Sequence, residues 1–313
     1  MLFVFLWSLF FRAAAAAVPN GSFVDVGAFV YDCWTTDDVV WGQHGANWTE
    51  WNLVRQATPR FAGHLQPKVP LWGELDTALP ATWDILTPAA VEHGVNTFLW
   101  DFYWFANMSA PVLARGLNEG FLTSATRNQA KWAIMWANQD WQDIHPAKRS
   151  TPRPTQFTGA VDAPTFTKMT DYWIANYLKL PNYYRVPDLS TTSPDRVCAL
   201  INVYMIDTLV AGLGGLDQTA AAVADFRARA AAAGVPCIHL QAEGFSLHNV
   251  GSKSIPEVIA ALGIDSVTDY CWQHYLEMKG FPIVRRAPPA PCREWPTRLT
   301  THLSHFTPHP PPL

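Results

Sequence analysis

Short segments of nearly continuous apolar character recur along the chain, and a polar stretch follows each of them. Six such segments are predicted to be strands: residues 24–31, 97–103, 131–136, 197–204, 236–241 and 266–272. Strands that are buried on both faces lack the alternation of a half-exposed strand, and this is typical of parallel sheets. The hydrophobic pattern therefore predicts a parallel sheet with both faces covered.

Helical segments lie between these strands and carry start and stop signals. We predict helices at residues 87–94, 162–178, 217–233 and 254–263, each with Pro or a capping residue near its start, and with Gly at the end of three of them. Regular alternation of strands and helices predicts an α/β fold. Six strands suit either an incomplete barrel or a doubly wound open sheet, and the strand count alone does not decide between them.

The two ends of the chain differ in composition from the centre. Residues 2–11 are apolar and residues 13–17 are alanines, which predicts a secretory signal peptide over residues 1–17 and a secreted protein. Residues 285–313 are rich in Pro, Arg and His without helix or strand periodicity, which predicts a disordered tail. The folded domain is expected at residues 24–284. No later segment is apolar and long enough to predict a membrane span.

Composition and charge indicate which class of partner the chain binds. With 49% hydrophobic and 15% charged residues in 313, the chain is globular, and its net charge of −4 gives no basic field for nucleic acid. Its 15 Trp could stack on sugar rings or fill the core. We expect a monomer whose partner is an oligosaccharide or polysaccharide. In a secreted protein, the sequons at Asn20, Asn47 and Asn107 would be glycosylation sites.

Neither metal nor cofactor chemistry is expected. The pairs His44/His64 and His239/His248 have no ligand-like sequence neighbours, and no zinc, dinucleotide, phosphate-loop or nucleophile-elbow motif occurs. Among the five cysteines, Cys198, Cys237 and Cys271 lie in apolar segments and are expected to be buried thiols and not a disulfide framework.

Carboxylate, amide and aromatic residues follow the predicted strands, where parallel α/β folds place their sites. Such groups can hydrogen-bond sugar hydroxyls and cover sugar rings. An Asp or Asn after a strand can equally be a helix cap or a turn former, and recurrence at several strand ends favours a site. The predicted substrate-binding residues are Glu50, Trp51, Asp101, Tyr103, Trp104, Trp136, Asn138, Gln139, Asp140, Tyr204, Glu243 and Trp272.

Three motifs in this order resemble the WbsX-like family, which is related to glycoside hydrolase family 99. They are TEWNLVRQATPRFAGHLQPKVP at residues 49–70, FLWDFYWF at 98–105 and MWANQDWQDIHPAK at 135–148. Weaker matches are LPNYYRV at 180–186 and DSVTDYCW at 265–272. The resemblance implies a (β/α)8 barrel of the TIM type. It also implies an activity on α-mannoside glycans in which the product retains the anomeric configuration of the substrate.

The resemblance also implies what is missing. The family's catalytic carboxylates lie in a late N-E-W-x-E motif, and the nearest segment here, REWPT at residues 293–297, lacks the Asn and the second Glu. Gln139 stands where many members have Glu. We therefore expect an incomplete barrel of about six strands, with no assigned catalytic residue. The function expected is a glycoside hydrolase-like protein that acts on or binds glycans. Alternatives are a glycosyltransferase of polysaccharide synthesis and a non-catalytic or truncated relative.

Overall fold

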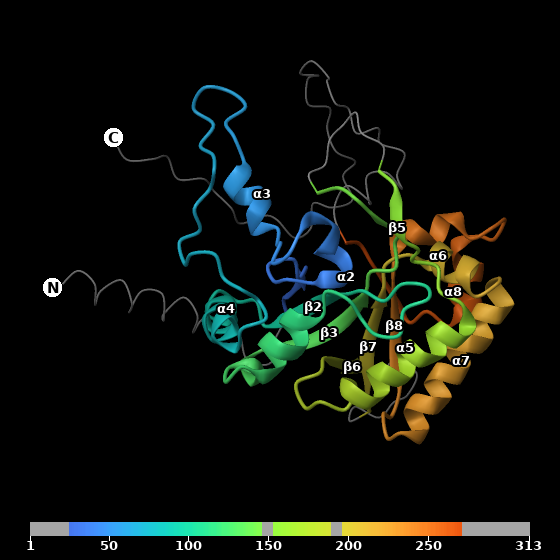
Figure 1. Ribbon diagram of the computed structural model, residues 1–313. Helices are drawn as coiled ribbons and strands as arrows, with labels where there is room; N and C mark the ends of the chain where they lie inside the picture. Colours follow the sequence, from blue (N-terminus) through green and yellow to red (C-terminus); the bar gives the residue numbers. More distant parts are fainter. Residues whose placement is uncertain (1–24, 146–152, 189–195, 271–313) are drawn as a thin grey trace, which may run out of the picture.

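A six-stranded parallel sheet forms the centre of the molecule in the computed structural model, which describes residues 25–145, 153–188 and 196–270 (Figure 1). The strand order follows the sequence, β1-β2-β3-β7-β8-β9, and β6 pairs antiparallel with β7. The bounds are β1 Gly27–Val30, β2 Thr97–Phe102, β3 Lys131–Trp136, β6 Arg185–Pro187, β7 Val197–Val203, β8 Ile238–Glu243 and β9 Ser266–Thr268. Each of the six predicted strands is confirmed, whereas β6 was not predicted. The expected signal peptide and tail lie outside the described residues.

Helices connect successive parallel strands, because a parallel crossover must return the chain to the opposite end of the sheet. Helices α5, α7 and α8 pack side by side over one face (Figure 1). The helix bounds are α2 Asp38–Trp41, α3 Trp51–Gln56, α4 Pro80–Glu92, α5 Ala163–Asn176, α6 Ile206–Gly212, α7 Leu216–Ala232 and α8 Ile255–Leu262. None of the helices in the described ranges is long and apolar enough to cross a bilayer.

The predicted helices are confirmed with one large boundary error. The helix predicted to open at residue 87 begins at Pro80 instead, and Pro88 lies inside it. The sequence predicts Pro88 in the first turn, but Pro80 occupies that position. The helix at 254–263 is as predicted, with a capping box between Ser254 and Glu257 and a left-handed Gly263 at its end.

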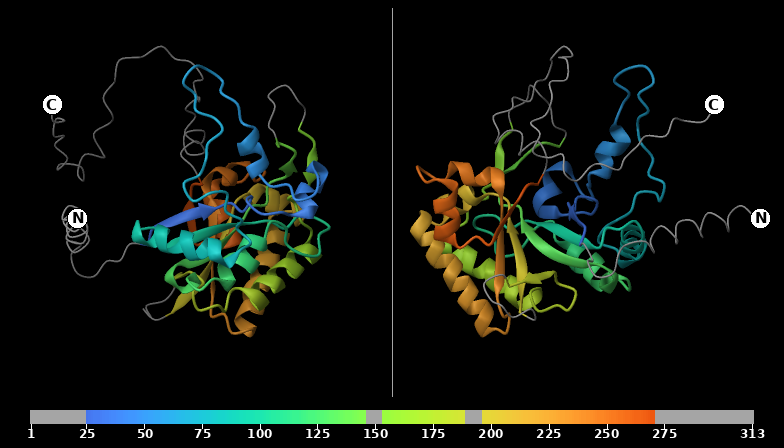
Figure 2. Two further views of the ribbon diagram at one scale, coloured as in Figure 1. Left: turned by 60° about the vertical axis from the view of Figure 1, so that its left-hand side comes forward. Right: turned by 180° about the vertical axis from the view of Figure 1, so that it is seen from behind.

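The sheet is curled, as in a barrel. β1 and β9 are at opposite ends of the strand order, yet the rings of Phe29 in β1 and Tyr270 after β9 are 4.6 Å apart. Figure 2 shows the strands from two further sides. The fold is therefore the predicted α/β arrangement, an incomplete (β/α) barrel with six parallel strands in the described residues.

Residues alternate between the two faces of the curled sheet. The strand register aligns five side chains of one level, Asp101, Met135, Asn202, Gln241 and Ser266. Hydrogen bonds link three of them: the Asn202 amide donates to Gln241 at 2.9 Å and the Gln241 amide to Ser266 at 3.1 Å. This row faces the barrel interior, and the large core between sheet and helices takes the alternate residues, including Trp100, Phe102, Trp136 and Val203.

Cys198 and Cys237 form a disulfide, so the expectation that both are unpaired thiols was wrong. The register of β7 and β8 pairs Ala199 with Ile238, which places the two preceding cysteines opposite each other, with Cα atoms 4.6 Å apart. Neighbouring parallel strands thus create a proximity that sequence spacing does not reveal. Cys33 is a free, buried thiol.

Reduction of this disulfide should destabilise the protein by about 4 kcal/mol, because a cross-link over 39 residues restricts the unfolded chain. The midpoint of chemical unfolding, compared with and without reductant, measures the effect. The double variant C198A/C237A should unfold at the midpoint of the reduced protein and should not respond to reductant. An unchanged midpoint on reduction would argue against the bond.

Candidate functional site

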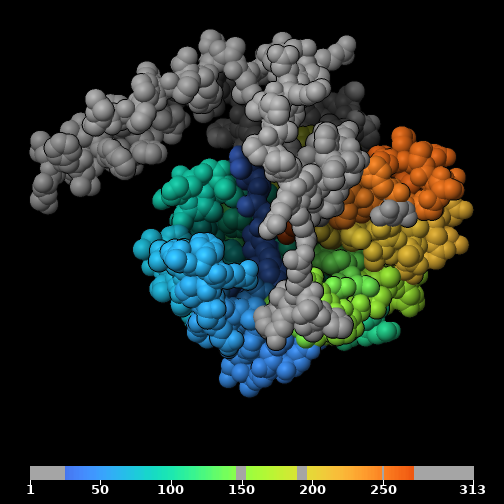
Figure 3. Space-filling view, turned by 90° about the horizontal axis from the view of Figure 1, so that it is seen from above, coloured from blue at the N-terminus to red at the C-terminus, as the bar shows by residue number. Residues whose placement is uncertain are grey.

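A pocket of about 310 Å³ opens on the inner face at the carboxyl ends of the strands. We call it the Asp101 pocket. Its lining residues are Tyr31, Glu50, Asp101, Tyr103, Met135, Ala137, Gln139, Trp141, Ile144, Tyr204 and Tyr270. Seen from above, the residues around β1 lie in a furrow between the light-blue segment near residue 60 and the green-to-orange half of the chain (Figure 3). This is the end at which barrel enzymes carry their sites.

Asp101 is the buried acid of the pocket, with 3% of its surface exposed. The Tyr270 hydroxyl donates to its Oδ2 at 3.4 Å, while Oδ1 has no hydrogen-bond partner in the described part of the chain. Burial, together with the nearby charge of Glu243, raises the pKa of Asp101 from 3.8 to about 8. The carboxyl group is therefore protonated at neutral pH and can donate a proton or a hydrogen bond.

Glu243 ends β8 and is fully buried beside this pocket without lining it. Burial raises its pKa from 4.5 to about 7, and the charge of Asp269 adds to that shift. Two acids on strands separated by β3 and β7 thus approach each other across the barrel interior, because the sheet is curled.

Glu50 reaches the pocket from the loop after β1. Its Oε1 accepts a hydrogen bond from the Tyr31 hydroxyl at 3.0 Å and lies 2.8 Å from His145 Nε2. The residue immediately before α3 thereby connects the first strand with the segment after β4 (Trp141–Gln142). These two contacts hold the Glu50 carboxylate at the rim.

Aromatic rings form the walls of the pocket. The ring of Tyr103 packs edge-on against Trp141 at 5.3 Å, and Tyr204 packs edge-on against Tyr270 at the same centroid distance. Tyr31 lies 6.2 Å from Tyr103. Rings held by such contacts present rigid apolar surfaces next to polar hydroxyls, a combination that suits the mixed surface of a sugar.

Five of the predicted binding residues line the Asp101 pocket: Glu50, Asp101, Tyr103, Gln139 and Tyr204. Their binding role remains a prediction. Glu243 adjoins the pocket, and Trp272 lies outside the described residues. Of the predicted glycosylation sites, Asn47 and Asn107 are exposed and Asn20 lies outside the described residues.

The remaining predicted residues do not line this pocket. Trp104 and Trp136 are buried in the core against the helices, where Trp104 packs on Tyr172 and Trp136 on Trp173. They have the opposite strand parity from Asp101 and Tyr103, so they point to the other face.

Asn138, Asp140 and Trp51 have other roles in the structure. The Asn138 side chain bonds both backbone groups of Met205, at 2.7 and 2.8 Å, and Asp140 accepts from the Gly159 backbone N–H at 2.9 Å. Trp51 lines a separate apolar groove of about 430 Å³ and packs against Trp34 with ring centroids 4.2 Å apart.

Tyr31, Trp141 and Tyr270 also line the pocket and are not among the predicted binding residues. Strand parity could have found Tyr31, because the register of β1 and β2, continued by one residue, places it level with Asp101. Trp141 lies in β4, which pairs with β5 (Thr155–Phe157). These two strands are too short to show an alternation of apolar and polar residues, so the sequence does not predict them.

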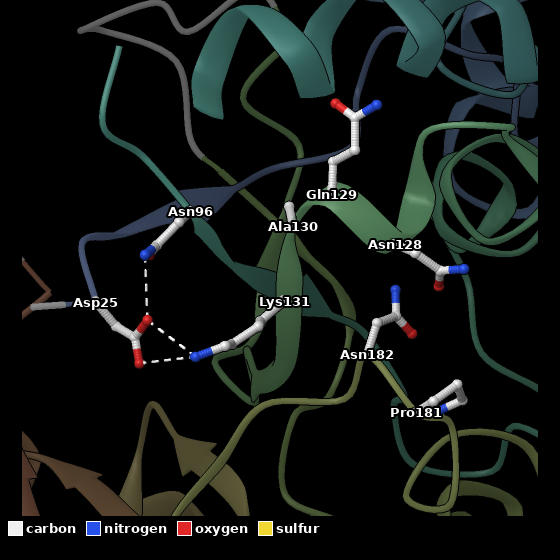
Figure 4. Close-up of a pocket in the computed structure, with 8 residues that line it drawn as sticks. All are labelled: Asp25, Asn96, Asn128, Gln129, Ala130, Lys131, Pro181 and Asn182. Carbon is white, nitrogen blue, oxygen red and sulfur yellow. Dashed lines mark hydrogen bonds and ion pairs between the residues drawn. The ribbon is translucent and has the colours of Figure 1, made fainter. Parts of the chain in front are cut away.

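A third hollow, of about 500 Å³, lies at the opposite end of the sheet (Figure 4). There Lys131 pairs with Asp25 at 3.0 Å, and Asn96 donates to the same carboxylate at 3.1 Å. These contacts tie the start of β1 to β3. The hollow is at the amino end of the strands, where barrel folds keep stabilising interactions.

Comparison with known proteins identifies relatives of this chain. Similar proteins include an uncharacterised protein, WxcX, from two strains of Xanthomonas campestris pv. campestris, each 29% identical over 154 residues. That match covers 49% of this chain and 20% of WxcX, so the chain spans about a fifth of the length of these relatives.

Two solved structures of a GH99 endo-alpha-mannosidase from Bacteroides thetaiotaomicron are also similar. One has a TM-score of 0.43 at 12% identity and covers 79% of this chain and 61% of that one. The other, in complex with bis-tris propane, has a TM-score of 0.33 at 11% identity, covering 80% and 84%.

The family match is more extensive. The family described as "Glycosyltransferase WbsX" matches residues 31–188, which is half of the chain and includes β2 to β6 and most of the Asp101 pocket. The chain belongs to this WbsX family.

Proposed function

We propose that this chain binds α-mannoside-type glycans in the Asp101 pocket and acts on them as a retaining glycoside hydrolase. One observation carries the proposal. A carboxyl group with a pKa of about 8 lies in an aromatic-walled pocket at the carboxyl ends of barrel strands. Membership of a glycan-active family supports the same substrate class.

Glycoside hydrolysis needs one carboxylic acid that protonates the leaving oxygen and a second carboxylate on the other side of the bond. In this proposal Asp101 is the acid, because it retains its proton at neutral pH. Glu50 is the second group, since it lines the same pocket and its position is set by Tyr31 and His145. Gln139 and Tyr204 would hold sugar hydroxyls.

Secretion is part of the proposal. The disulfide between Cys198 and Cys237 supports it, because such bonds persist in oxidising compartments. Glycosylation at Asn47 and Asn107 would follow from secretion, and both side chains are exposed. The monomeric state stays a prediction.

Titration of the purified protein with manno-oligosaccharides, followed by Trp fluorescence, tests the binding step. We expect saturable binding, because Trp141 lines the pocket. Y204A should weaken binding about tenfold by removing a wall of the pocket. N128A is the matched control, since Asn128 is exposed in the hollow at the opposite end of the sheet, and it should bind as the unmodified chain does.

Release of reducing sugar from the same oligosaccharides tests the reaction. D101N and E50Q should each lower turnover by at least a hundredfold while binding changes only a few-fold. Binding without any release in the unmodified chain would overturn the hydrolase assignment and favour a glycan-binding protein. Sugar transfer that depends on an added nucleotide sugar would favour the transferase alternative. Absence of saturable binding would reject the proposal altogether.

A further inference from the structure

A cluster of His44, Asp143 and His145 lies at the rim of the barrel mouth. Each of the three offers one ligand atom, and these atoms all lie within 4.8 Å of one another. His44 Nε2 and Asp143 Oδ1 are 3.7 Å apart. The cluster joins two segments distant in sequence, because His44 ends the 3-10 turn after α2 (Gly42–His44) and the other two follow β4.

The two imidazole rings are held in place by tryptophans. His44 stacks on Trp48 at 4.5 Å, and His145 packs edge-on against Trp41 at 4.9 Å. His145 is also parallel to Trp141 within 13° at 6.1 Å. Rings confined in this way lose little further freedom when both bind a common partner.

Glu50 fixes which nitrogen of His145 is available. Its Oε1 is 2.8 Å from His145 Nε2, so that nitrogen carries the proton and Nδ1 is left as the possible ligand atom. A carboxylate behind a histidine is the arrangement that orients metal-binding imidazoles in proteins. Asp143 Oδ1 is also close to this residue, at 3.3 Å from the His145 backbone nitrogen.

We propose that His44, Asp143 and His145 form a binding site for a divalent metal ion of the zinc class. Two imidazoles and a carboxylate are ligands that Zn²⁺ accepts, with bond lengths near 2.1 Å and ligand atoms roughly 3.3 Å apart. Small rotations of the Asp143 and His44 side chains would bring the present 3.7 Å to that value. Asp143 and Glu50 supply two negative charges, which match the charge of the ion.

The burial of the three side chains suits such a site. Asp143 is 37% exposed, so an ion can enter from solvent, while His145 is only 7% exposed. The Gln43 amide lies 3.3 Å from His44 Nε2, and metal binding would replace that contact. The sequence alone does not predict this cluster, because His44 and its partners are about a hundred residues apart along the chain.

A bound ion would have a structural consequence for the Asp101 pocket. Glu50, Trp141 and Ile144 line the pocket, and all three belong to the segments that the metal would join. The ion would therefore fix the rim on which Glu50 lies. This role does not depend on which glycan, if any, the pocket accepts.

The test uses the whole chain without a polyhistidine tag, stripped of metal with a chelator and then titrated with Zn²⁺ by calorimetry. We expect one equivalent to bind and the thermal midpoint to rise with Zn²⁺ concentration. Co²⁺ in place of Zn²⁺ should give the visible absorption of a four-coordinate site. H44A and D143N should each weaken Zn²⁺ binding at least tenfold, whereas H93A, which removes an exposed histidine near the end of α4, should not.

D143N retains side-chain size and provides a second variant if H44A folds poorly, and circular dichroism checks both. Failure to bind one equivalent, or equal binding by the unmodified chain, H44A and D143N, would overturn the proposal. The cluster would then consist of two ordinary histidine–carboxylate contacts. Because no glycan is present in this experiment, its outcome is independent of the proposed function.

Discussion

Asp101→Asn should raise stability at alkaline pH and leave it nearly unchanged at acidic pH. The pKa of Asp101 rises from 3.8 in the unfolded chain to about 8 in the folded protein. Between these values the unfolded state is ionised and the folded state is protonated, so stability falls by about 1.4 kcal/mol per pH unit. Below pH 3.8 both states are protonated, and above pH 8 both are ionised. Over the window the loss is on the order of 5 kcal/mol.

Urea unfolding of both proteins from pH 4 to pH 9 measures this difference. Glu243 and Asp32 have folded pKa values raised to about 7 and about 6, and their contributions have the same sign. The pH dependence that these two acids add to stability ends near pH 7. From pH 7 to pH 8, the free energy of unfolding should therefore fall with pH in the unmodified chain and stay nearly constant in D101N. E92Q, which removes an exposed carboxylate, controls for net charge. Parallel curves for D101N and the unmodified chain would contradict burial as the cause.

Trp136→Ala should destabilise the protein by about 4 kcal/mol without removing glycan binding by the folded fraction. Trp136 is fully buried, packs against Phe166 at 6.1 Å and Trp173 at 6.0 Å, and donates from its indole to the Trp104 carbonyl at 3.4 Å. Its loss leaves a cavity between the sheet and α5. Equilibrium unfolding at pH 7 gives the change in free energy.

Trp72→Ala is the matched control, since Trp72 is 51% exposed, and it should cost about 1 kcal/mol or less. A similar loss of stability for both variants would mean that the Trp136 side chain is not in the core. Loss of binding in W136A with unchanged stability would indicate that Trp136 contacts glycan, as the sequence predicts.

The sequence predicts the sheet well because its strands are apolar on both faces. Residues 131–136 are predicted with both ends correct, and the strand–helix alternation predicts a parallel sheet, whose strand order is seen in the structure. β4, β5 and β6 escape prediction because they have two or three residues each and are defined by their partners. The sequence does not predict the Cys198–Cys237 disulfide either, because the bond depends on how β7 pairs with β8.

The site was predicted to the correct end of the sheet, but two of the residues there, Trp104 and Trp136, were assigned to the wrong face. Continuous apolar strands hide parity, and consecutive aromatic residues such as Tyr103 and Trp104 give no sign of which one points inward. Asp101 indicates which residues of β2 face the barrel interior. Because side chains alternate along a strand, Tyr103 then faces inward with Asp101, and Trp104 faces the helices.

Contact between Phe29 and Tyr270 has a consequence for biosynthesis. The Asp101 pocket takes Tyr31 from just after the first strand and Tyr270 from just after the last described one, with almost the whole described chain between them. Contacts this distant in sequence form late. A nascent polypeptide still attached to the ribosome at β8 would have both Asp101 and Glu50 but no finished pocket. A glycan that binds the pocket as proposed could therefore not stabilise a partly synthesised chain, because the pocket forms only once Tyr270 has been added.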